Sequence, residues 1–400
     1  MPHAGTESVQ LTLAERDRRY AAIRERLRER SVDCVITSGS NLFYLTNGLP
    51  GDRFGLLTAQ EGIPLTAVIH RRYFVDLSPQ VLIDAQEWVK ELKSGLDAKP
   101  LVEKIKDLGL QQGTVGVTGS NVGYGGLSHG FCNQLAEALP GAQVVDVSDI
   151  FADVRTLKSA EEIRMIEEAN RVFDAAIDRV HEVARPGMTG AQIVQEGIKA
   201  MWAAGGDMES TFFFTFGPVP LQNPVLARLG LQRTIQDGDM GTMTAHSEYG
   251  HYAGHTDQEI SFGKPKSLHQ EMFEGVLYIR NAVLERVKDG ATQRELTDAY
   301  TSACQETGFR SSPHSQIHQY GIDVPEFPGP AFRVADAQGG KGLGGGGNFV
   351  LRSGMIYSIS PTLVANDGED TLLGGTSLVV TDDGYRELSD RKVELLVGNS

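Results

Sequence analysis

The sequence predicts an α/β protein of two domains, one over residues 1–155 and one over residues 156–400. In the first part, short apolar segments alternate with amphipathic helical segments, which is typical of an α/β layer domain. In the second part, one order of helix, turn, helix and strands occurs twice, which indicates an α+β domain with an internal duplication. The chain has 400 residues, enough for two domains that each bury a core.

The composition excludes several classes of function. The chain has 52 acidic and 37 basic residues, a net charge of -15 and a pI near 5.2. This acidic balance argues against nucleic acid or an anionic membrane as a partner. The three cysteines, Cys34, Cys132 and Cys304, are too far apart for a clustered zinc site and too few for a disulfide framework. Because the sequence shows no secretory signal and no apolar run that could span a membrane, we expect a cytoplasmic protein.

The first predicted helix begins at a capping box formed by Thr12 and Glu15 and continues to about residue 30. A buried strand over residues 33–38 and a helical turn over residues 41–45 follow. Strands and helices then alternate up to the domain boundary. The expected strands lie at residues 55–57, 65–69, 114–117 and 144–147, and the expected helices at residues 98–108 and 127–138.

Three further capping boxes mark helix starts in the second domain. They are formed by Ser159 and Glu162, by Thr189 and Gln192, and by Thr292 and Glu295. The last two each follow a helix that ends in a glycine-containing turn, so the same pattern occurs at corresponding points of two halves. Strand-like sequence follows in both halves, at residues 211–216, 239–262, 349–359 and 371–381. We therefore expect two similar halves around one curved sheet.

Histidines gather in the second domain, where six of the ten lie between residues 246 and 318. In an extended strand, residues two apart share a face, so His255, Asp257 and Glu259 are expected to point the same way. A base and two acids on one face suit proton transfer or metal binding. A polar strand that merely faces solvent is the alternative.

Two other segments have simpler interpretations. The aromatic cluster of Phe212, Phe213, Phe214 and Phe216 lies on a predicted strand. We expect it in the core of a sheet covered on both faces, with a pocket wall as the alternative. The glycine-rich tract at residues 339–347 is interpreted as a surface loop, with a substrate lid as the alternative.

Several short motifs follow one another in an order that is typical of a known family. They are KSAEEI at 158–163, RPGMT at 185–189, DGD at 237–239, RSGM at 352–355 and SP at 360–361. With them the chain resembles the creatinase/prolidase/methionine aminopeptidase family over essentially its whole length. The resemblance implies a creatinase-type N-terminal domain followed by a pita-bread catalytic domain.

The resemblance also shows where this chain departs from the family. In its metallopeptidases, two Asp, one His and two Glu hold a pair of metal ions, and only the His is kept here, as His318. The four carboxylate positions correspond to Thr244, His255, Ser360 and Gly375. Two hard cations need such anionic oxygens, so we expect no metal cofactor. A rebuilt single-metal site of His246, His255 and His318 is the alternative.

The family also includes metal-free members, creatinase and the ectoine hydrolases, which open C–N bonds in small zwitterionic compounds. Asp257 corresponds to the active-site Glu of creatinase. The catalytic His that precedes Asn-Pro-Val in creatinase is Gln222 here, which cannot transfer a proton, so creatine itself is not expected as the substrate. The resemblance therefore implies His255, Asp257 and His318 as the catalytic acid–base residues.

The same resemblance supplies substrate-binding candidates. In creatinase, an Arg of the N-terminal domain reaches the site of the neighbouring subunit and binds the substrate carboxylate. Arg53 occupies that place, which implies a homodimer and an acidic substrate. The full set of substrate-binding candidates is Gln222, Arg53, Glu259, Glu326 and Tyr252.

The sequence thus predicts a metal-independent hydrolase that cleaves a C–N bond in a small, polar, carboxylated nitrogen compound. One alternative is a lyase, because a His/Asp pair can also abstract an acidic α-proton. A second is a non-catalytic pita-bread binding module. A third is a metal-dependent Xaa-Pro peptidase with a rebuilt site.

Overall fold

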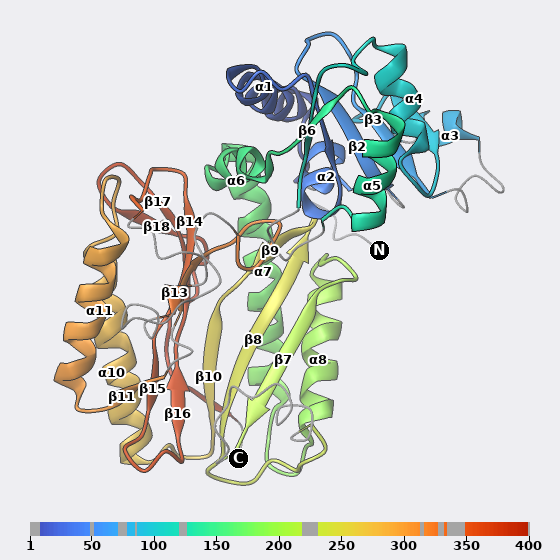
Figure 1. The fold of residues 1–400 in the computed structure, drawn as a ribbon. Coiled ribbons are helices and arrows are strands. Elements are labelled where there is room, and N and C mark those ends of the chain that lie inside the picture. The colour runs from blue at the N-terminus through green and yellow to red at the C-terminus, as the bar shows by residue number, and fades with distance from the viewer. Residues whose placement is uncertain are drawn as a thin grey trace. The chain divides into compact units, whose positions relative to one another are not determined.

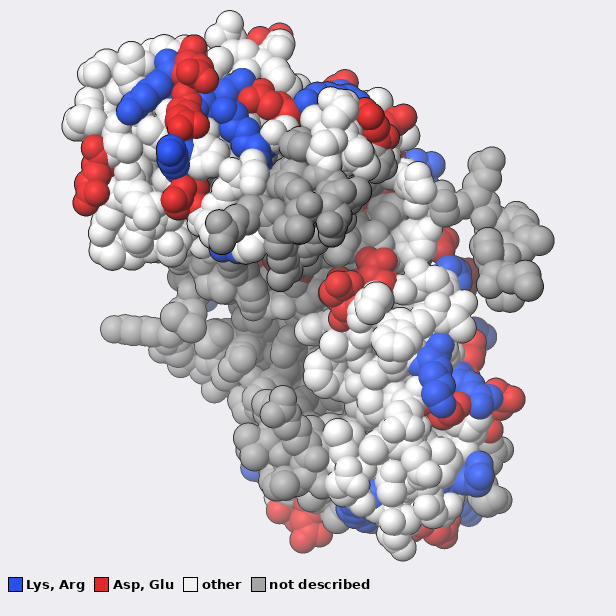
Figure 2. Space-filling view, turned by 90° about the vertical axis from the view of Figure 1, so that its right-hand side faces the viewer, with Lys and Arg blue, Asp and Glu red and all other residues white. Residues whose placement is uncertain are grey.

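The structure is a computed structural model that describes residues 9–48, 52–70, 78–84, 86–119, 126–217, 231–312, 316–326, 332–333 and 349–398. It divides into two compact units, an N-terminal unit of Gln10–Arg155 and a C-terminal unit built mainly from Thr156–Ser400. Gln222, His314 and the glycine-rich tract at 339–347 lie outside the described residues. Of the helices in the described part, none is long and apolar enough to cross a membrane. On the face shown in Figure 2, acidic and basic side chains lie among one another.

The N-terminal unit contains a mixed sheet of six strands in the order β4-β3-β2-β1-β5-β6. Its strands are β1 (Cys34–Thr37), β2 (Asp52–Thr58), β3 (Thr66–Ile69), β4 (Glu91–Ser94), β5 (Thr114–Val117) and β6 (Gln143–Asp146). Its helices are α1 (Leu13–Glu29), α2 (Gly39–Thr46), α3 (Pro79–Asp84), α4 (Lys99–Asp107), α5 (His129–Ala138) and α6 (Ser148–Thr156). The predicted alternation of helices and short strands is confirmed, and the apolar faces of α4 and α5 pack on the central strands.

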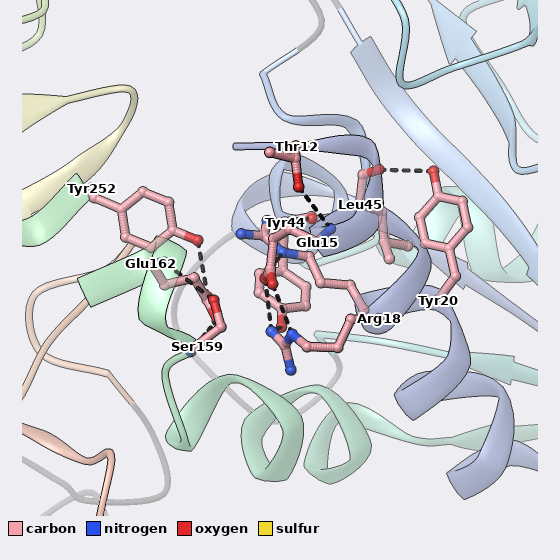
Figure 3. Close-up of polar contacts among 10 residues, drawn as sticks. Thr12, Glu15, Arg18, Tyr20, Tyr44, Leu45, Ser159, Glu162 and Tyr252 are labelled. Carbon is pink, nitrogen blue, oxygen red and sulfur yellow. Dashed lines mark hydrogen bonds and ion pairs between the residues drawn. The ribbon is translucent and has the colours of Figure 1, made fainter. Parts of the chain in front are cut away.

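A buried charge pair fixes the first helix of this unit (Figure 3). Thr12 caps α1 by accepting the backbone N–H of Glu15, and the Glu15 carboxylate bonds both Arg18 and Arg19 at 2.7 Å. The Arg19 side chain is fully buried, with its guanidinium 4.2 Å from the centre of the Tyr44 ring. The charge of this carboxylate is therefore balanced inside the unit.

The C-terminal unit repeats two helices followed by strands. The first half contains α7 (Ala160–Val183), α8 (Gly190–Ala203), β7 (Thr211–Phe216), β8 (Met240–Tyr249), β9 (Tyr252–Gly254) and β10 (Asp257–Phe262). The second half contains α10 (Ser267–Leu284), α11 (Gln293–Thr307), β11 (Arg310–Ser311), β12 (Gln316–Gln319), β13 (Phe332–Arg333), β14 (Ile356–Ser360), β15 (Thr362–Val364), β16 (Thr371–Leu373), β17 (Thr376–Val380) and β18 (Tyr385–Glu387). The last strand, β19 (Leu396–Gly398), returns to pair with β10 of the first half.

Backbone hydrogen bonds at the two helix–turn–helix junctions match, which supports the duplication. In the first half, the N–H of Gly187 donates to the carbonyl of Ile235, and in the second half the N–H of Gly290 donates to that of Leu351. Both glycines have a positive φ, at 93° and 80°, which favours glycine at the turn. The capping boxes that start α8 and α11 are also both present.

Each half has its own apolar core. Figure 1 shows α7 and α8 on one side of the strands and α10 and α11 on the other. Phe212, Phe214 and Phe216 pack into the first core, against residues of α7 and α8. Phe213 points to the opposite face and is 50% exposed, so the expectation of a fully buried cluster is wrong at this one position. The reason is the alternation of side chains along β7, which turns Phe213 away from the core that the strand forms with α7 and α8.

Candidate active site

The candidate site lies where strands of the two halves meet inside the C-terminal unit. β8 and β10 pair antiparallel, with Asp257 opposite Thr244 and Glu259 opposite Thr242. β12 and β14 pair antiparallel in the second half, with His318 opposite Ser358. Contacts between the halves then bring Ser360 and Gly375 to Asp257, so the site contains residues from both halves.

The carboxylate of Asp257 is held at both oxygens by hydroxyl groups. The Thr244 hydroxyl donates to Oδ1 at 2.5 Å, and the Ser360 hydroxyl donates to Oδ2 at 2.6 Å. The side chain is buried, and hydrogen bonds to a charged group are roughly twice as strong as those between neutral groups. This arrangement fixes the direction in which the remaining lone pairs of Asp257 point.

The positions at which the family carries metal-binding carboxylates converge around Asp257. Thr244 and Ser360 bond it directly. A Cβ built on Gly375 would lie 2.5 Å from Ser360 Oγ and 2.9 Å from Asp257 Oδ2. A side chain at Gly375 would therefore displace the hydroxyl or the carboxylate. The four positions supply two hydroxyls, an imidazole and a glycine, a donor set that does not fit a pair of hard cations.

Three histidine rings form a row, and the first, His246, lies on the same strand and face as Thr244, the partner of Asp257. The His246 and His255 ring centres are 5.1 Å apart, and those of His255 and His318 are 5.0 Å apart. Nδ1 of His255 contacts the carbonyl of Ala245 at 3.2 Å, and Nδ1 of His318 contacts that of Gln319 at 3.1 Å. Because a carbonyl only accepts, each Nδ1 carries the proton, and in the neutral ring Nε2 is the basic atom. Nε2 of His318 is buried and has no hydrogen-bond partner among the described residues.

Burial keeps two of these rings neutral. It lowers the pKa of His246 to about 4 and, together with the neighbouring His255, lowers the pKa of His318 to about 3. Both imidazoles are therefore unprotonated near pH 7, the state in which they can accept a proton.

A rebuilt metal site from His246, His255 and His318 would need their nitrogen atoms to converge. Among the described residues, the set of three metal-type ligand atoms that lie within 4.8 Å of one another is Asp207, Glu248 and His251. That set is part-exposed and excludes all three histidines of the row. The described geometry thus gives the three-histidine metal site no support.

Glu259 lies next to Asp257 on the same face of β10 and is fully buried. Its Oε1 accepts from the Thr242 hydroxyl at 2.7 Å and from the backbone N–H of Leu373 at 3.1 Å, whereas Oε2 has no partner in the described part of the chain. Burial raises the pKa of Glu259 to about 8, because desolvation outweighs these hydrogen bonds and Asp257 repels the charge. The group is therefore largely protonated at neutral pH.

The other sequence-predicted residues have partners within the fold or lie elsewhere. The buried Tyr252 hydroxyl donates to Glu162 at 2.9 Å (Figure 3), and the buried Glu326 forms an ion pair with Lys158 at 2.5 Å. Arg53 is exposed on β2 of the N-terminal unit. A substrate-binding role for each of these residues stays a prediction, as does that of Gln222, which lies outside the described residues.

The sequence reasoning treated Thr244, Ser360 and Gly375 only as lost ligands and missed their contacts with Asp257. It also missed Ser377, whose hydroxyl donates to the backbone carbonyl of His255. The contact of Thr244 with Asp257 could have been predicted, because β8 and β10 are close in sequence and such strands usually pair. The contacts of Ser360 and Ser377 cross between the halves, and no local sequence pattern marks them.

Two family models match the chain. The model of metallopeptidase family M24 matches residues 164–384, and the model of the creatinase/prolidase N-terminal domain matches residues 19–157. Because the first covers more than half of the chain, the protein belongs to metallopeptidase family M24. The predicted family is thus confirmed, whereas its metal-free branch stays a prediction.

Individual relatives agree with this assignment. The Xaa-Pro dipeptidase of Pyrococcus horikoshii is 24% identical over 374 residues, which cover 92% of this chain and 95% of the relative. Among solved structures, the X-Pro aminopeptidase from Thermotoga maritima superposes with a TM-score of 0.77 at 16% identity, covering 94% of this chain and 99% of the other. The prolidase from Pyrococcus horikoshii gives a TM-score of 0.74 at 21% identity, with coverage of 94% and 99%. These structures confirm the predicted pita-bread fold with its N-terminal domain.

Proposed function

We propose that the protein is a hydrolase that cleaves an amide-type C–N bond in a small, carboxylate-bearing substrate, using Asp257 and the histidine row for acid–base chemistry. The observation that carries the proposal is the buried Asp257 carboxylate, held by two hydroxyls at the point where the family's ligand positions converge. A fixed carboxylate together with the neutral, buried imidazoles of the row suits proton transfer.

The relatives narrow the substrate class. Several are named Xaa-Pro dipeptidase, which favours a dipeptide ending in proline over the non-peptide compound that the sequence first indicated. Such a dipeptide is itself small, zwitterionic and carboxylated. We therefore place Xaa-Pro dipeptides first among the substrates to assay and non-peptide amides second.

In the proposed reaction, Nε2 of His255 accepts a proton from the water molecule that attacks the carbonyl carbon. The C–O bond forms, the C–N bond breaks, and the imidazolium returns the proton to the leaving nitrogen. The products are a carboxylic acid and an amine. Asp257 orients the attacking water or the substrate amine and balances the transient positive charge, and Nε2 of His318 offers a second acceptor within the row.

The test combines product analysis with metal removal. Purified protein is incubated in H₂¹⁸O with Ala-Pro, Leu-Pro and N-acetylproline, before and after exhaustive dialysis against a chelator, and metal content is measured on the same samples. We expect ¹⁸O in the new carboxylate and equal rates before and after dialysis. Cleavage without ¹⁸O would identify a lyase.

A second candidate is the metal-dependent Xaa-Pro peptidase, which the names of the relatives favour. The four altered ligand positions argue against it in this chain. Stoichiometric metal, with activity that is lost on chelation and restored by a divalent cation, would establish this candidate and contradict a metal-independent site. Binding of these compounds without turnover in any sample would favour a binding module.

A further inference from the structure

Phe213 is an exposed aromatic residue in the middle of strand β7. Its neighbours Phe212 and Phe214 are 4% and 2% exposed and pack in the core, whereas Phe213 is 50% exposed. A single exposed apolar residue needs no explanation by itself. The position of Phe213 on the sheet, however, connects it to the candidate site.

Strand pairing places Phe213 in one row with the candidate catalytic carboxylate. Phe213 on β7 lies opposite Thr244 on β8, and Thr244 lies opposite Asp257 on β10. Residues that are paired across neighbouring strands point to the same face of a sheet. With strands about 4.8 Å apart, the Cα atoms of Phe213 and Asp257 are separated by about 10 Å, a distance that one small substrate can span.

Phe213 contacts a neutral side chain on this face. Its ring meets the ring of His246 edge to face, with 5.9 Å between the ring centres, and burial keeps His246 neutral near pH 7. His246 in turn contacts His255, so a continuous aromatic wall leads from the exposed Phe213 to the histidine row. An apolar substrate group against this wall would remove apolar surface from water on both molecules.

We propose that Phe213 is a specificity-determining residue that receives an apolar side chain of the substrate next to the scissile C–N bond. The inference rests on the proposed function, because it takes Asp257 and the histidine row as the reaction site. Among dipeptides, Phe213 is expected to favour those whose first residue is bulky and apolar over those that begin with glycine.

The test measures kcat and KM for Gly-Pro, Ala-Pro, Leu-Pro and Phe-Pro with four proteins: wild type, Phe213→Ala, Phe213→Leu and the control Trp202→Ala. Trp202 is equally exposed, at 51%, but lies on α8, which packs on the opposite face of the sheet. Wild type is expected to prefer Leu-Pro over Gly-Pro. Phe213→Ala should lower kcat/KM for Leu-Pro by roughly 10- to 100-fold, mainly through KM, and for Gly-Pro by less than about twofold. Phe213→Leu should restore most of the loss.

Equal losses for all four dipeptides would overturn the inference, since a purely structural role of Phe213 has that effect. An unchanged Leu-Pro to Gly-Pro ratio in Phe213→Ala would overturn it as well, while leaving the proposed function intact. If wild type hydrolyses none of the dipeptides, the substrate assignment fails, and calorimetric titration with leucine and glycine tests Phe213 separately. Tighter leucine binding by wild type than by Phe213→Ala supports the inference, and equal or absent binding overturns it.

Discussion

Two buried carboxylates in this chain are stabilised in opposite ways. In the N-terminal unit, Glu15 bonds Arg18 and Arg19. Burial alone would raise the pKa of Glu15, but the hydrogen bonds and charges of the two arginines lower it below its usual value. In the C-terminal unit, Asp257 receives hydrogen bonds from Thr244 and Ser360, which are neutral.

The difference separates a structural carboxylate from a candidate catalytic one. A guanidinium neutralises Glu15 and fixes helix α1, so no charge is left over for a ligand. Hydroxyl donors orient the carboxyl group of Asp257 without placing a cation against it, so the group can bind a substrate or exchange a proton. Glu259 has no cationic partner among the described residues, and burial raises its pKa, so it avoids the cost of a buried charge by staying protonated.

The largest effect is expected at the candidate catalytic carboxylate. Asp257→Asn keeps the size of the side chain but removes its charge, so kcat for the substrate should fall by about 10²–10⁴-fold. Thermal unfolding checks that the fold is retained, and Asp382→Asn, in an exposed turn, is the matched control. Unchanged turnover in Asp257→Asn would remove this residue from the mechanism.

The opposite outcome is expected for the structural carboxylate. Arg19→Met leaves Glu15 with only the half-exposed Arg18 and should lower the free energy of unfolding by about 3–5 kcal/mol, measured by urea denaturation. The turnover of the folded fraction should not change. Combining Arg19→Met with Glu15→Gln should recover part of the loss, because no buried charge then remains unpaired. A loss below about 1 kcal/mol would show that the pair is unimportant for stability.

The raised pKa of Glu259 predicts a loss of stability at alkaline pH. Its pKa is about 8 in the folded chain and 4.5 as the ordinary value, so the folded state binds the proton more tightly than the unfolded state. The resulting stabilisation is complete below pH 4.5 and is lost as the pH rises towards 8. Between pH 5 and pH 8, wild type should lose on the order of 4 kcal/mol more than Glu259→Gln in urea unfolding. Parallel pH curves for the two proteins would contradict the assignment.

The lowered pKa of His318 predicts a smaller loss of stability at acidic pH. Its pKa is about 3 in the folded chain against an ordinary 6.5, so the unfolded state binds the proton more tightly. Its stabilisation is present above pH 6.5 and is lost as the pH falls. From pH 7 to pH 5, wild type should lose about 2 kcal/mol more than His318→Gln. His269→Gln, at a buried histidine of α10 outside the row, is the comparison variant.

The sequence predicted those parts of the molecule that depend on local patterns. The capping residues Ser159, Thr189 and Thr292 each start a helix as expected, because a cap and its partner lie within one turn. Asp257 and Glu259 share a face of β10, as the period of two predicts. His255 comes before the strand begins, so its position depends on its contacts with Ala245 and Ser377 rather than on that period.

The remaining features of the site depend on contacts between distant segments. Ser360 is 103 positions away from Asp257 in sequence, and their contact exists only because the two halves pack together. The exposure of Phe213 depends on which face of β7 the helices cover, and four phenylalanines within six residues give no sign of it. Composition and periodicity contain neither piece of information.

The division of the site between the two halves has a consequence for how the protein acquires activity. Thr244 and Asp257 belong to the first half, and Ser360 and Gly375 belong to the second, while each half has its own helices and its own apolar core. The helices are local structures within each half, whereas the site is complete only when both halves pack together, as they also must for β19 to pair with β10. On refolding, we expect helical signal to return first and enzymatic activity to return only when the halves dock, so that activity reports the last step of assembly.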